Sequence, residues 1–163
     1  KFVEIDLGEM SQTAQGYAKA LTLEQLERQR QGMARVCSQS DVVITTAQLF
    51  GRKAPVVVTK DMIARMKPGS IIVDMAVESG GNVEGSKVNE EVVTANGVRI
   101  LGPGNLPGHA AVHASQMYSA NLHNLLEEYW NKDTKIFDLN TEDEIIKGCL
   151  VTHGGKVVNP MLK

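Results

Sequence analysis

Two short runs rich in β-branched residues constrain the fold of this chain more than any other feature: Asp41–Ala47 (DVVITTA) and Ile71–Ala76 (IIVDMA). Each run is apolar through its middle, which is typical of a strand buried inside a sheet. A helical pattern precedes each run, over Leu23–Gln39 and Thr59–Met66, and the alternation in Phe2–Asp6 predicts an earlier strand. Strands and helices that alternate in this order favour an open parallel sheet of the α/β class.

Capping and turn signals bound these elements. Thr22 stands as the N-cap of the first helix with Gln25 three residues later, which is the arrangement of a capping box. Pro68-Gly69 ends the second helix. Asn96-Gly97 predicts a tight turn between two further strands. Those strands are expected over Glu91–Thr94 and Val98–Leu101.

The last third of the chain has a different pattern. Apolar residues at helical spacing predict a long helix over Ser115–Trp130. Thr141 and Glu144 have the spacing of a capping box, so a further helix is expected to start at Thr141. Cys149–Thr152 and Lys156–Val158 flank a glycine pair and predict a β-hairpin. The fold class that follows is α/β, with a parallel sheet and helices, plus a long helix and a hairpin.

Composition excludes several classes of function. The 163 residues carry 17 basic and 19 acidic side chains, a net charge of −2, and only 4% are aromatic, which argues against nucleic-acid binding. No segment approaches the roughly 20 apolar residues that span a bilayer. Cys37 and Cys149 are far apart and read as free thiols of a cytosolic protein. His109 and His113 are four residues apart, but no carboxylate or cysteine completes a metal site there.

Three loops are expected where strands of the parallel sheet end, which is where such sheets bind ligands. They are Gln48–Pro55, Val77–Asn82 and Gly102–Gly108. The last of them resembles a phosphate-binding glycine loop, but Pro107 stands where the third glycine of GxGxxG belongs. We therefore expect a stiff connecting loop, in which Asn105 and Pro107 are placed to line a cofactor cleft.

Glu78 follows the second buried strand and is the one candidate for a catalytic group. A carboxylate there serves as a general base or binds a ribose hydroxyl, and a solvated loop residue is an equal alternative. The neighbouring Gly80 and Gly81 predict a tight turn or a close backbone approach. Tyr17, in the loop Gly16–Lys19, is either a lid residue that closes on a ligand or a surface anchor.

No nucleophile–base pair is recognisable in the sequence. Hydride transfer between two nicotinamide rings needs none, because it moves no proton at the reacting carbon and requires only positioning and exclusion of water.

A resemblance to a known family rests on motifs that run in order through nearly the whole chain. These are GYAK from Gly16, DVVITTA from Asp41, GRKAP from Gly51, MKPGS from Met66, IVDMAVESGGN from Ile72, NGVRILGPGNL from Asn96, ASQMY from Ala114 and NLHNLL from Asn121. In these motifs the chain is similar to the C-terminal portion of the alpha subunits of proton-translocating NAD(P) transhydrogenases, which are related to alanine dehydrogenases.

The resemblance implies a partial Rossmann-like fold. It implies that residues 1–113 are the later part of an NAD(H)-binding domain, that 114–131 form a helix crossing to an outer domain, and that 132–163 belong to that outer domain. In the family, the GxGxxG turn and the acidic residue that binds the adenosine ribose come before the position of Phe2. We therefore expect the chain to be a piece of a longer protein, and expect the 163 residues alone to bind NADH weakly.

Family residues carry over one position at a time. The loop with Gly16 and Tyr17 is like the mobile loop that closes over NAD(H), and Glu78 stands where alanine dehydrogenases have the Asp of D-Q-G-G. The sequence departs from the family pattern at two positions: Gln48 stands where many members have Leu, and His109 stands where an Arg is common. The resemblance predicts cofactor contacts at Gly16, Tyr17, Gln29, Thr46, Ala47, Gln48, Glu78, Gly80, Gly81, Asn105, Leu106 and Pro107. No metal ligand is predicted.

The activity that the resemblance implies is hydride transfer from NADH to NADP+ bound on a partner component. The expected partners are an NADP(H)-binding component and a membrane-spanning component that moves protons, with the full-length subunit a homodimer on the cytoplasmic face of the inner membrane. Two alternatives stay open. The first is an NAD-dependent alanine dehydrogenase, and the second is a nucleotide-binding or structural fragment without activity of its own.

Overall fold

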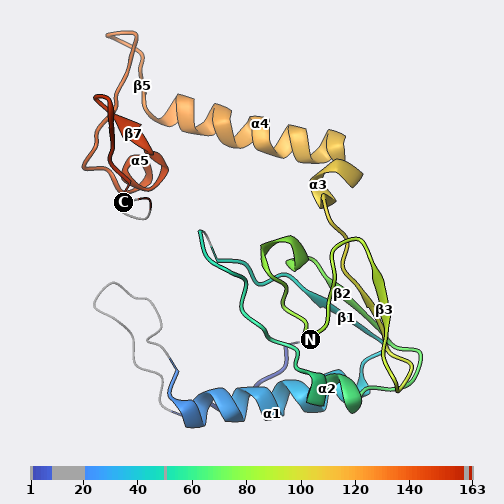
Figure 1. The fold of residues 1–163 in the computed structure, drawn as a ribbon. Helices are drawn as coiled ribbons and strands as arrows, with labels where there is room; N and C mark the ends of the chain where they lie inside the picture. Colours follow the sequence, from blue (N-terminus) through green and yellow to red (C-terminus); the bar gives the residue numbers. More distant parts are fainter. Residues whose placement is uncertain (1, 9–20, 50, 160–161, 163) are drawn as a thin grey trace. The chain divides into compact units, whose positions relative to one another are not determined.

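The structure is a computed structural model that describes residues 2–8, 21–49, 51–159 and 162. The chain forms two compact units, residues 1–104 and residues 105–163. The first unit contains a four-stranded sheet with helices, and the second contains an 18-residue helix and two small hairpins. Figure 1 shows the elements in chain order.

The sheet of the first unit is built from β1 (Val42–Thr45), β2 (Ile71–Asp74), β3 (Glu91–Val93) and β4 (Arg99–Leu101), in the spatial order β1-β2-β4-β3. β1 pairs with β2 and β2 pairs with β4, both in parallel, whereas β3 and β4 form an antiparallel hairpin. The turn predicted at Asn96-Gly97 joins this hairpin, and Gly97 has the positive φ of 82° that a glycine allows there. The parallel α/β sheet expected from the sequence is confirmed.

Two helices cover one face of this sheet. They are α1 (Leu23–Gln39) and α2 (Lys60–Ala64), which lie beside each other below the strands in Figure 1. The capping box of Thr22 and Gln25 is present, and Thr59 caps α2 as predicted. The core consists of apolar side chains from both helices, the strands and the loops between them. It comprises Ala34, Cys37, Val58, Met62, Ile63, Met66, Ile72, Val83, Val98 and Ile100.

The opposite face of β1 is open, which corrects the prediction of a fully buried strand. Val42 is 56% exposed and Ile44 is 62% exposed, whereas Val43 and Thr45 on the other face are covered. β1 is an edge strand of the described sheet, and α1 and α2 pack against only one of its faces. The apolar run therefore predicts the strand correctly, but it does not tell how many faces are covered.

The strand predicted at Phe2–Asp6 is wrong. Residues 2–8 have no regular secondary structure, because no strand of the described sheet pairs with them. Ile5 instead packs against α1, where a Cβ built on Gly32 would come within 2.7 Å of the Ile5 side chain. Ile5 thus contacts a helix rather than pairing in the sheet, and Val3 is exposed.

The second unit differs from its prediction in two helix starts. Its long helix begins at Ala111 rather than Ser115, and its last helix is capped by Asp143 rather than Thr141. Asp143 accepts the N–H groups of both Ile145 and Ile146, a stronger cap than the Thr141 hydroxyl. The elements are α3 (Leu106–His109), α4 (Ala111–Glu128), β5 (Trp130–Asn131), β6 (Ile136–Phe137), α5 (Glu144–Cys149), β7 (Thr152–His153) and β8 (Lys156–Val157).

The long helix also ends earlier than predicted, at Glu128, and Trp130 pairs with Phe137 in the β5–β6 hairpin instead. β7 and β8 form the predicted antiparallel hairpin. No side chain of α4 is buried, and its apolar residues Tyr118, Leu122 and Leu126 are exposed. None of the helices in the described residues is long and apolar enough to cross a membrane. Both cysteines are free, and burial of Cys37 in the core of the first unit raises the pKa of its thiol.

Candidate functional site

The carboxyl ends of β1 and β2 meet at one edge of the sheet. Thr45 and Asp74 are the last residues of the two strands and lie opposite each other in the register. The loops that follow, 46–59 after β1 and 75–90 after β2, leave the sheet at this edge, as predicted. We refer to Thr46, Ala47, Gln48, Glu78, Gly80 and Gly81, which all lie in these loops, as the strand-end site.

Asp74 is the centre of the hydrogen bonds at this edge. Its side chain is fully buried and accepts the N–H of Asn82 at 2.9 and 3.1 Å, the N–H of Val83 at 3.1 Å and the N–H of Ala76 at 3.0 Å. The carboxylate therefore satisfies three backbone donors that the turn after β2 leaves without a partner in the sheet. The turn from Met75 to Val83 is folded around this one side chain.

Asn82 connects that turn to the loop after β1. Its carboxamide oxygen accepts the N–H of Ala47 at 2.9 Å, and its NH₂ group donates to the carbonyls of Ala47 at 2.8 Å and Pro55 at 2.7 Å. Its own carbonyl accepts the N–H groups of Val57 and Val58. Asn82 is fully buried, and these bonds use the side-chain oxygen and both amide hydrogens.

The predicted residues around Asn82 are arranged in two groups. Thr46 and Gln48 are exposed on either side of Ala47, and Gln48 donates its side-chain N–H to the carbonyl of Met75 at 3.4 Å. Glu78 is exposed in the short 3₁₀ helix η1 (Val77–Ser79), which follows β2. The structure therefore brings Gln48 close to the chain that leads into η1.

The glycine pair after Glu78 has the tight turn that the sequence predicts. Gly80 and Gly81 have φ values of 109° and 80°, which glycine adopts without steric cost. A Cβ on Gly81 would stand 2.9 Å from the Asp74 carboxylate, so this position has no room for a side chain. A Cβ on Gly80 would meet the Lys53 side chain, which lies over the turn.

The other predicted residues are not part of this cluster. Gln29 lies half-buried in α1 and takes no part in the bonds made by Asp74 and Asn82. Gly16 and Tyr17 fall outside the described residues. Asn105, Leu106 and Pro107 belong to the second unit, where Asn105 has a φ of 50° and precedes α3.

The prediction of a stiff loop over Gly102–Gly108 is only partly correct. Gly102 does lie close to backbone, since a Cβ there would overlap the carbonyl of Lys87, and Gly104 donates its N–H to Asn89. From Leu106, however, the chain turns into α3, which has Pro107 in its first turn. Proline is favoured there because the first N–H groups of a helix have no partner within the helix.

Asp74 and Asn82 are the two residues of the edge that sequence reasoning missed. Both lie inside a motif that carries the family resemblance, but neither was among the predicted contacts. A usable signal was present: Asp74 is a lone carboxylate at the end of an apolar run, where a buried charge requires several donors. Asn82 carries no comparable local signal, because its partners lie 27 and 35 residues away in the sequence.

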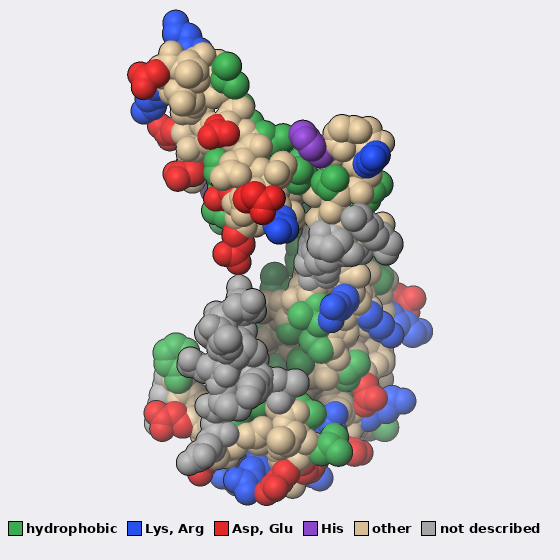
Figure 2. Space-filling model, turned by 90° about the vertical axis from the view of Figure 1, so that its left-hand side faces the viewer, with side chains coloured by type: hydrophobic (Ala, Val, Ile, Leu, Met, Phe, Trp, Pro, Cys, Tyr) green, Lys and Arg blue, Asp and Glu red, His purple; other side chains and the backbone are tan. Residues whose placement is uncertain are grey.

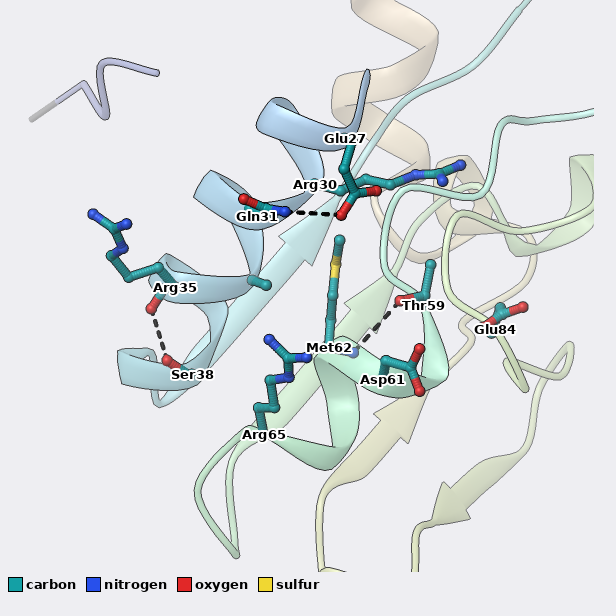
Figure 3. A pocket seen from close by; sticks show the side chains of 11 residues that line it. Glu27, Arg30, Gln31, Arg35, Ser38, Thr59, Asp61, Met62, Arg65 and Glu84 are labelled. Atoms are coloured by element: carbon teal, nitrogen blue, oxygen red, sulfur yellow. Dashed lines mark hydrogen bonds between the residues drawn. The ribbon is translucent and has the colours of Figure 1, made fainter. Parts of the chain in front are cut away.

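A groove between α1 and α2 has a volume of about 720 Å³ (Figure 3). Arg30, Arg35 and Arg65 line it together with three acidic residues. Glu27 accepts a bond from Gln31, and Glu84 accepts the first N–H of α2, so these two carboxylates are engaged locally. None of the predicted cofactor residues lines this groove.

Neither the surface charge nor the metal-ligating side chains point to a further site among the described residues. Figure 2 shows acidic and basic side chains interspersed on the face in view. Among the described residues, no group of three or more His, Cys, Asp or Glu side chains is placed to hold a metal ion.

Comparison with known proteins gives the family. The model of the alanine dehydrogenase/PNT C-terminal domain matches residues 2–160. The chain belongs to this family. An NAD(P) transhydrogenase alpha subunit polypeptide from Rhodospirillum rubrum is 40% identical over 99% of the chain, which covers 42% of that relative. An alanine dehydrogenase from Halomonas elongata is 37% identical over 48% of the chain, which covers 22% of it.

A solved structure supports the same assignment. The crystal structure of a transhydrogenase from Sinorhizobium meliloti superposes on this family member with a TM-score of 0.66 at 43% identity, covering 83% of this chain and 37% of that one. The partial Rossmann-like fold expected from the resemblance is thereby confirmed. The chain spans about two fifths of the length of the Rhodospirillum rubrum relative, which it matches over nearly its own whole length.

Proposed function

We propose that the chain supplies the strand-end part of the NAD(H) site of a transhydrogenase alpha subunit. The observation that carries the proposal is the extent of the similarity. The transhydrogenase polypeptide from Rhodospirillum rubrum matches 99% of the chain, whereas the alanine dehydrogenase from Halomonas elongata matches less than half. The strand-end site supports it, since ligands of open α/β sheets bind at this edge.

The residues at this edge fit one part of a dinucleotide. Thr46, Gln48 and Glu78 are exposed polar side chains that suit ribose hydroxyls and amide groups. They do not fit a pyrophosphate, which needs a GxGxxG turn and the N–H groups of a helix start. The 163 residues contain no such turn. Losing it costs on the order of several kcal/mol, so the chain alone is proposed to bind NADH weakly.

In this proposal the protein positions the reaction rather than taking part in proton transfer. The nicotinamide ring supplies the hydride when NADH is bound. Gln48 and Thr46 orient the nucleoside from the β1 side, and Glu78 accepts hydroxyl hydrogen bonds from the β2 side. The family resemblance assigns the further nucleotide contacts to Gly16, Tyr17, Gln29, Asn105, Leu106 and Pro107. Because only hydride moves, Glu78 has no proton to remove.

Partners complete the proposed activity. The acceptor NADP+ is held by a second, NADP(H)-binding component, and a membrane-spanning component couples hydride transfer to proton movement. The alpha subunit is then a homodimer, held at the cytoplasmic face of the inner membrane through these partners. The family resemblance assigns residues 114–131 to the segment that crosses to the outer domain and 132–163 to that outer domain.

One alternative has an observation in its favour. Glu78 occupies the place of the D-Q-G-G aspartate of alanine dehydrogenases, so a carboxylate is available at the position where that reaction needs a base. A nucleotide-binding or structural fragment without activity is the other reading.

Two assays on the intact subunit distinguish these functions. Reconstituted with the NADP(H)-binding component, the subunit is expected to oxidise NADH with NADP+ as acceptor and to form no NADH from alanine and NAD+. Alanine-dependent NADH formation would support the dehydrogenase instead. Absence of both activities, with the subunit folded and the partner shown to bind NADP+, would support the fragment.

A further inference from the structure

We propose that Asn82 is a positioning residue of the NAD(H) site, which it shapes by holding the backbone of Ala47. The inference rests on the proposed function, because it concerns the geometry of the same site. Asn82 does not face the ligand: it is fully buried, and the bonds of its carboxamide go to protein backbone. It acts through Thr46 and Gln48, which are exposed on either side of Ala47.

The geometry of the Asn82–Ala47 pair is specific. One carboxamide accepts the N–H of Ala47 at 2.9 Å and donates to the carbonyl of the same residue at 2.8 Å. Ala47 lies beyond the end of β1, where no neighbouring strand of the described sheet pairs with it. The carboxamide makes the two backbone hydrogen bonds that a paired strand would otherwise make. Both polar groups of the Ala47 backbone have a partner in this way.

Asn82 is itself held in place by its main chain. Its N–H donates to both oxygens of Asp74, and its carbonyl accepts the N–H groups of Val57 and Val58. The second amide hydrogen of its side chain is donated to the carbonyl of Pro55 at 2.7 Å, later in the loop after β1. One side chain thus holds two points of that loop, Ala47 and Pro55, against the turn that contains Glu78 and the glycine pair.

The side-chain chemistry makes asparagine difficult to replace. Aspartate has the same shape, but its carboxylate only accepts, so it faces the carbonyls of Ala47 and Pro55 without a donor. Two lone-pair contacts then replace two hydrogen bonds inside a site with no water exposure. The β1 loop is expected to move away from the turn, and Thr46 and Gln48 move with it.

Asn96 provides a matched control at the other end of the sheet. It is partly buried and donates its side-chain NH₂ group to the carbonyls of Ile63 and Met66, at 3.0 and 3.3 Å. Its oxygen accepts the hydroxyl of Thr94, in the turn that precedes β4. Asn96→Asp therefore removes the same kind of bonds from the same unit, but at the amino end of the parallel strands.

The test measures NADH affinity and steady-state rates of the intact subunit with its NADP(H)-binding component. Asn82→Asp is expected to raise both the KM and the Kd for NADH about tenfold or more. The kcat at saturating NADH is expected to change less than about threefold. Asn96→Asp is expected to lower the thermal midpoint with no change in KM. Lowering the pH protonates the introduced carboxyl, which then donates one bond, so NADH affinity of Asn82→Asp is expected to recover in part.

Each other result has a defined meaning. If Asn82→Asp loses stability as Asn96→Asp does but keeps the KM of the unmutated protein, the positioning role is wrong. If Asn82→Asp does not fold, Asn82→Ser retains one donor and one acceptor, and an unchanged KM in that variant overturns the proposal equally. If the unmutated subunit itself does not bind NADH, the proposed function fails first, and this inference fails with it.

Discussion

The carboxylate of Asp74 accepts the backbone N–H of Asn82 through both of its oxygens, at distances of 3.1 and 2.9 Å. The two residues lie eight positions apart, at the two ends of the turn that carries Glu78. This contact closes the turn and places the Asn82 side chain against Ala47. The stability of the first unit and the shape of its strand-end site therefore depend on the same bond.

Replacing Asp74 by asparagine tests this dependence. Asp74→Asn keeps the volume but turns one acceptor into a donor, which then faces backbone N–H groups that have no other partner. We expect a loss of about 2–3 kcal/mol in the free energy of unfolding, measured by urea denaturation. The matched control is Asp61→Asn at an exposed position of α2, which is expected to change stability by less than about 0.5 kcal/mol. A loss below about 1 kcal/mol for Asp74→Asn would contradict the account.

Alanine substitutions at Gly81 and Gly85 distinguish the cost of a steric clash from the cost of a positive φ in one loop. Their φ values are similar, 80° and 87°, but a Cβ on Gly81 meets the Asp74 carboxylate at 2.9 Å and one on Gly85 meets nothing within 4 Å. Gly85→Ala is expected to cost about 1 kcal/mol, the usual cost of a left-handed alanine. Gly81→Ala is expected to cost about 2–4 kcal/mol because it also displaces Asp74. Equal losses in urea unfolding would show that the predicted close approach to Asp74 is wrong.

The second unit contains a hydrogen-bonded pair, Tyr129 and Asp143, whose contribution to stability depends on pH. Tyr129 donates its hydroxyl to Asp143 at 2.6 Å, and this bond raises the pKa of Tyr129 to about 12 and lowers the pKa of Asp143. A raised tyrosine pKa contributes stability that is present below the unfolded value of about 10 and is lost as pH rises toward the folded value. A lowered aspartate pKa contributes stability that is present above about 4 and is lost in acid.

Tyr129→Phe is therefore expected to flatten the fall in stability between about pH 10 and pH 12. Trp130, the single tryptophan of the chain, reports unfolding of this unit by its fluorescence. Tyr118→Phe, at an exposed position of α4, is the control and should keep the alkaline slope of the unmutated protein. The assignment of the pair is incorrect if the two variants have the same slope.

Local signals in the sequence predicted the elements of the first unit well. The capping box at Thr22 and Gln25, the cap at Thr59 and the turn at Asn96-Gly97 are all present, because each depends on residues within a few positions. Phe2–Asp6 failed for the opposite reason. A strand exists only when another strand pairs with it, and β-propensity does not reveal whether that partner is there.

The position of the loops at the strand ends was predictable from the sequence, but their geometry was not. The rule that ligands bind at the carboxyl ends of parallel strands located the loops after β1 and β2. The bonds that set their geometry, from Asn82 to Ala47 and to Pro55, join segments 35 and 27 residues apart. No pattern of neighbouring residues encodes such contacts. The cap of α5 was also mispredicted, since Asp143 caps this helix and Thr141 does not. Spacing alone cannot rank two candidate caps that stand two residues apart.

In the proposed function, Glu78 positions a nucleotide and does not act as a base. The direct measurement is the rate of hydride transfer from NADH to NADP+ by the intact subunit carrying Glu78→Gln, with its NADP(H)-binding component. Glu90→Gln, at an exposed position later in the same loop, is the control. We expect Glu78→Gln to retain the activity within about tenfold, or about 1.4 kcal/mol in the barrier. The opposite result is alanine-dependent NADH formation by the unmutated subunit that Glu78→Gln lowers on the order of a hundredfold or more, as loss of a general base does.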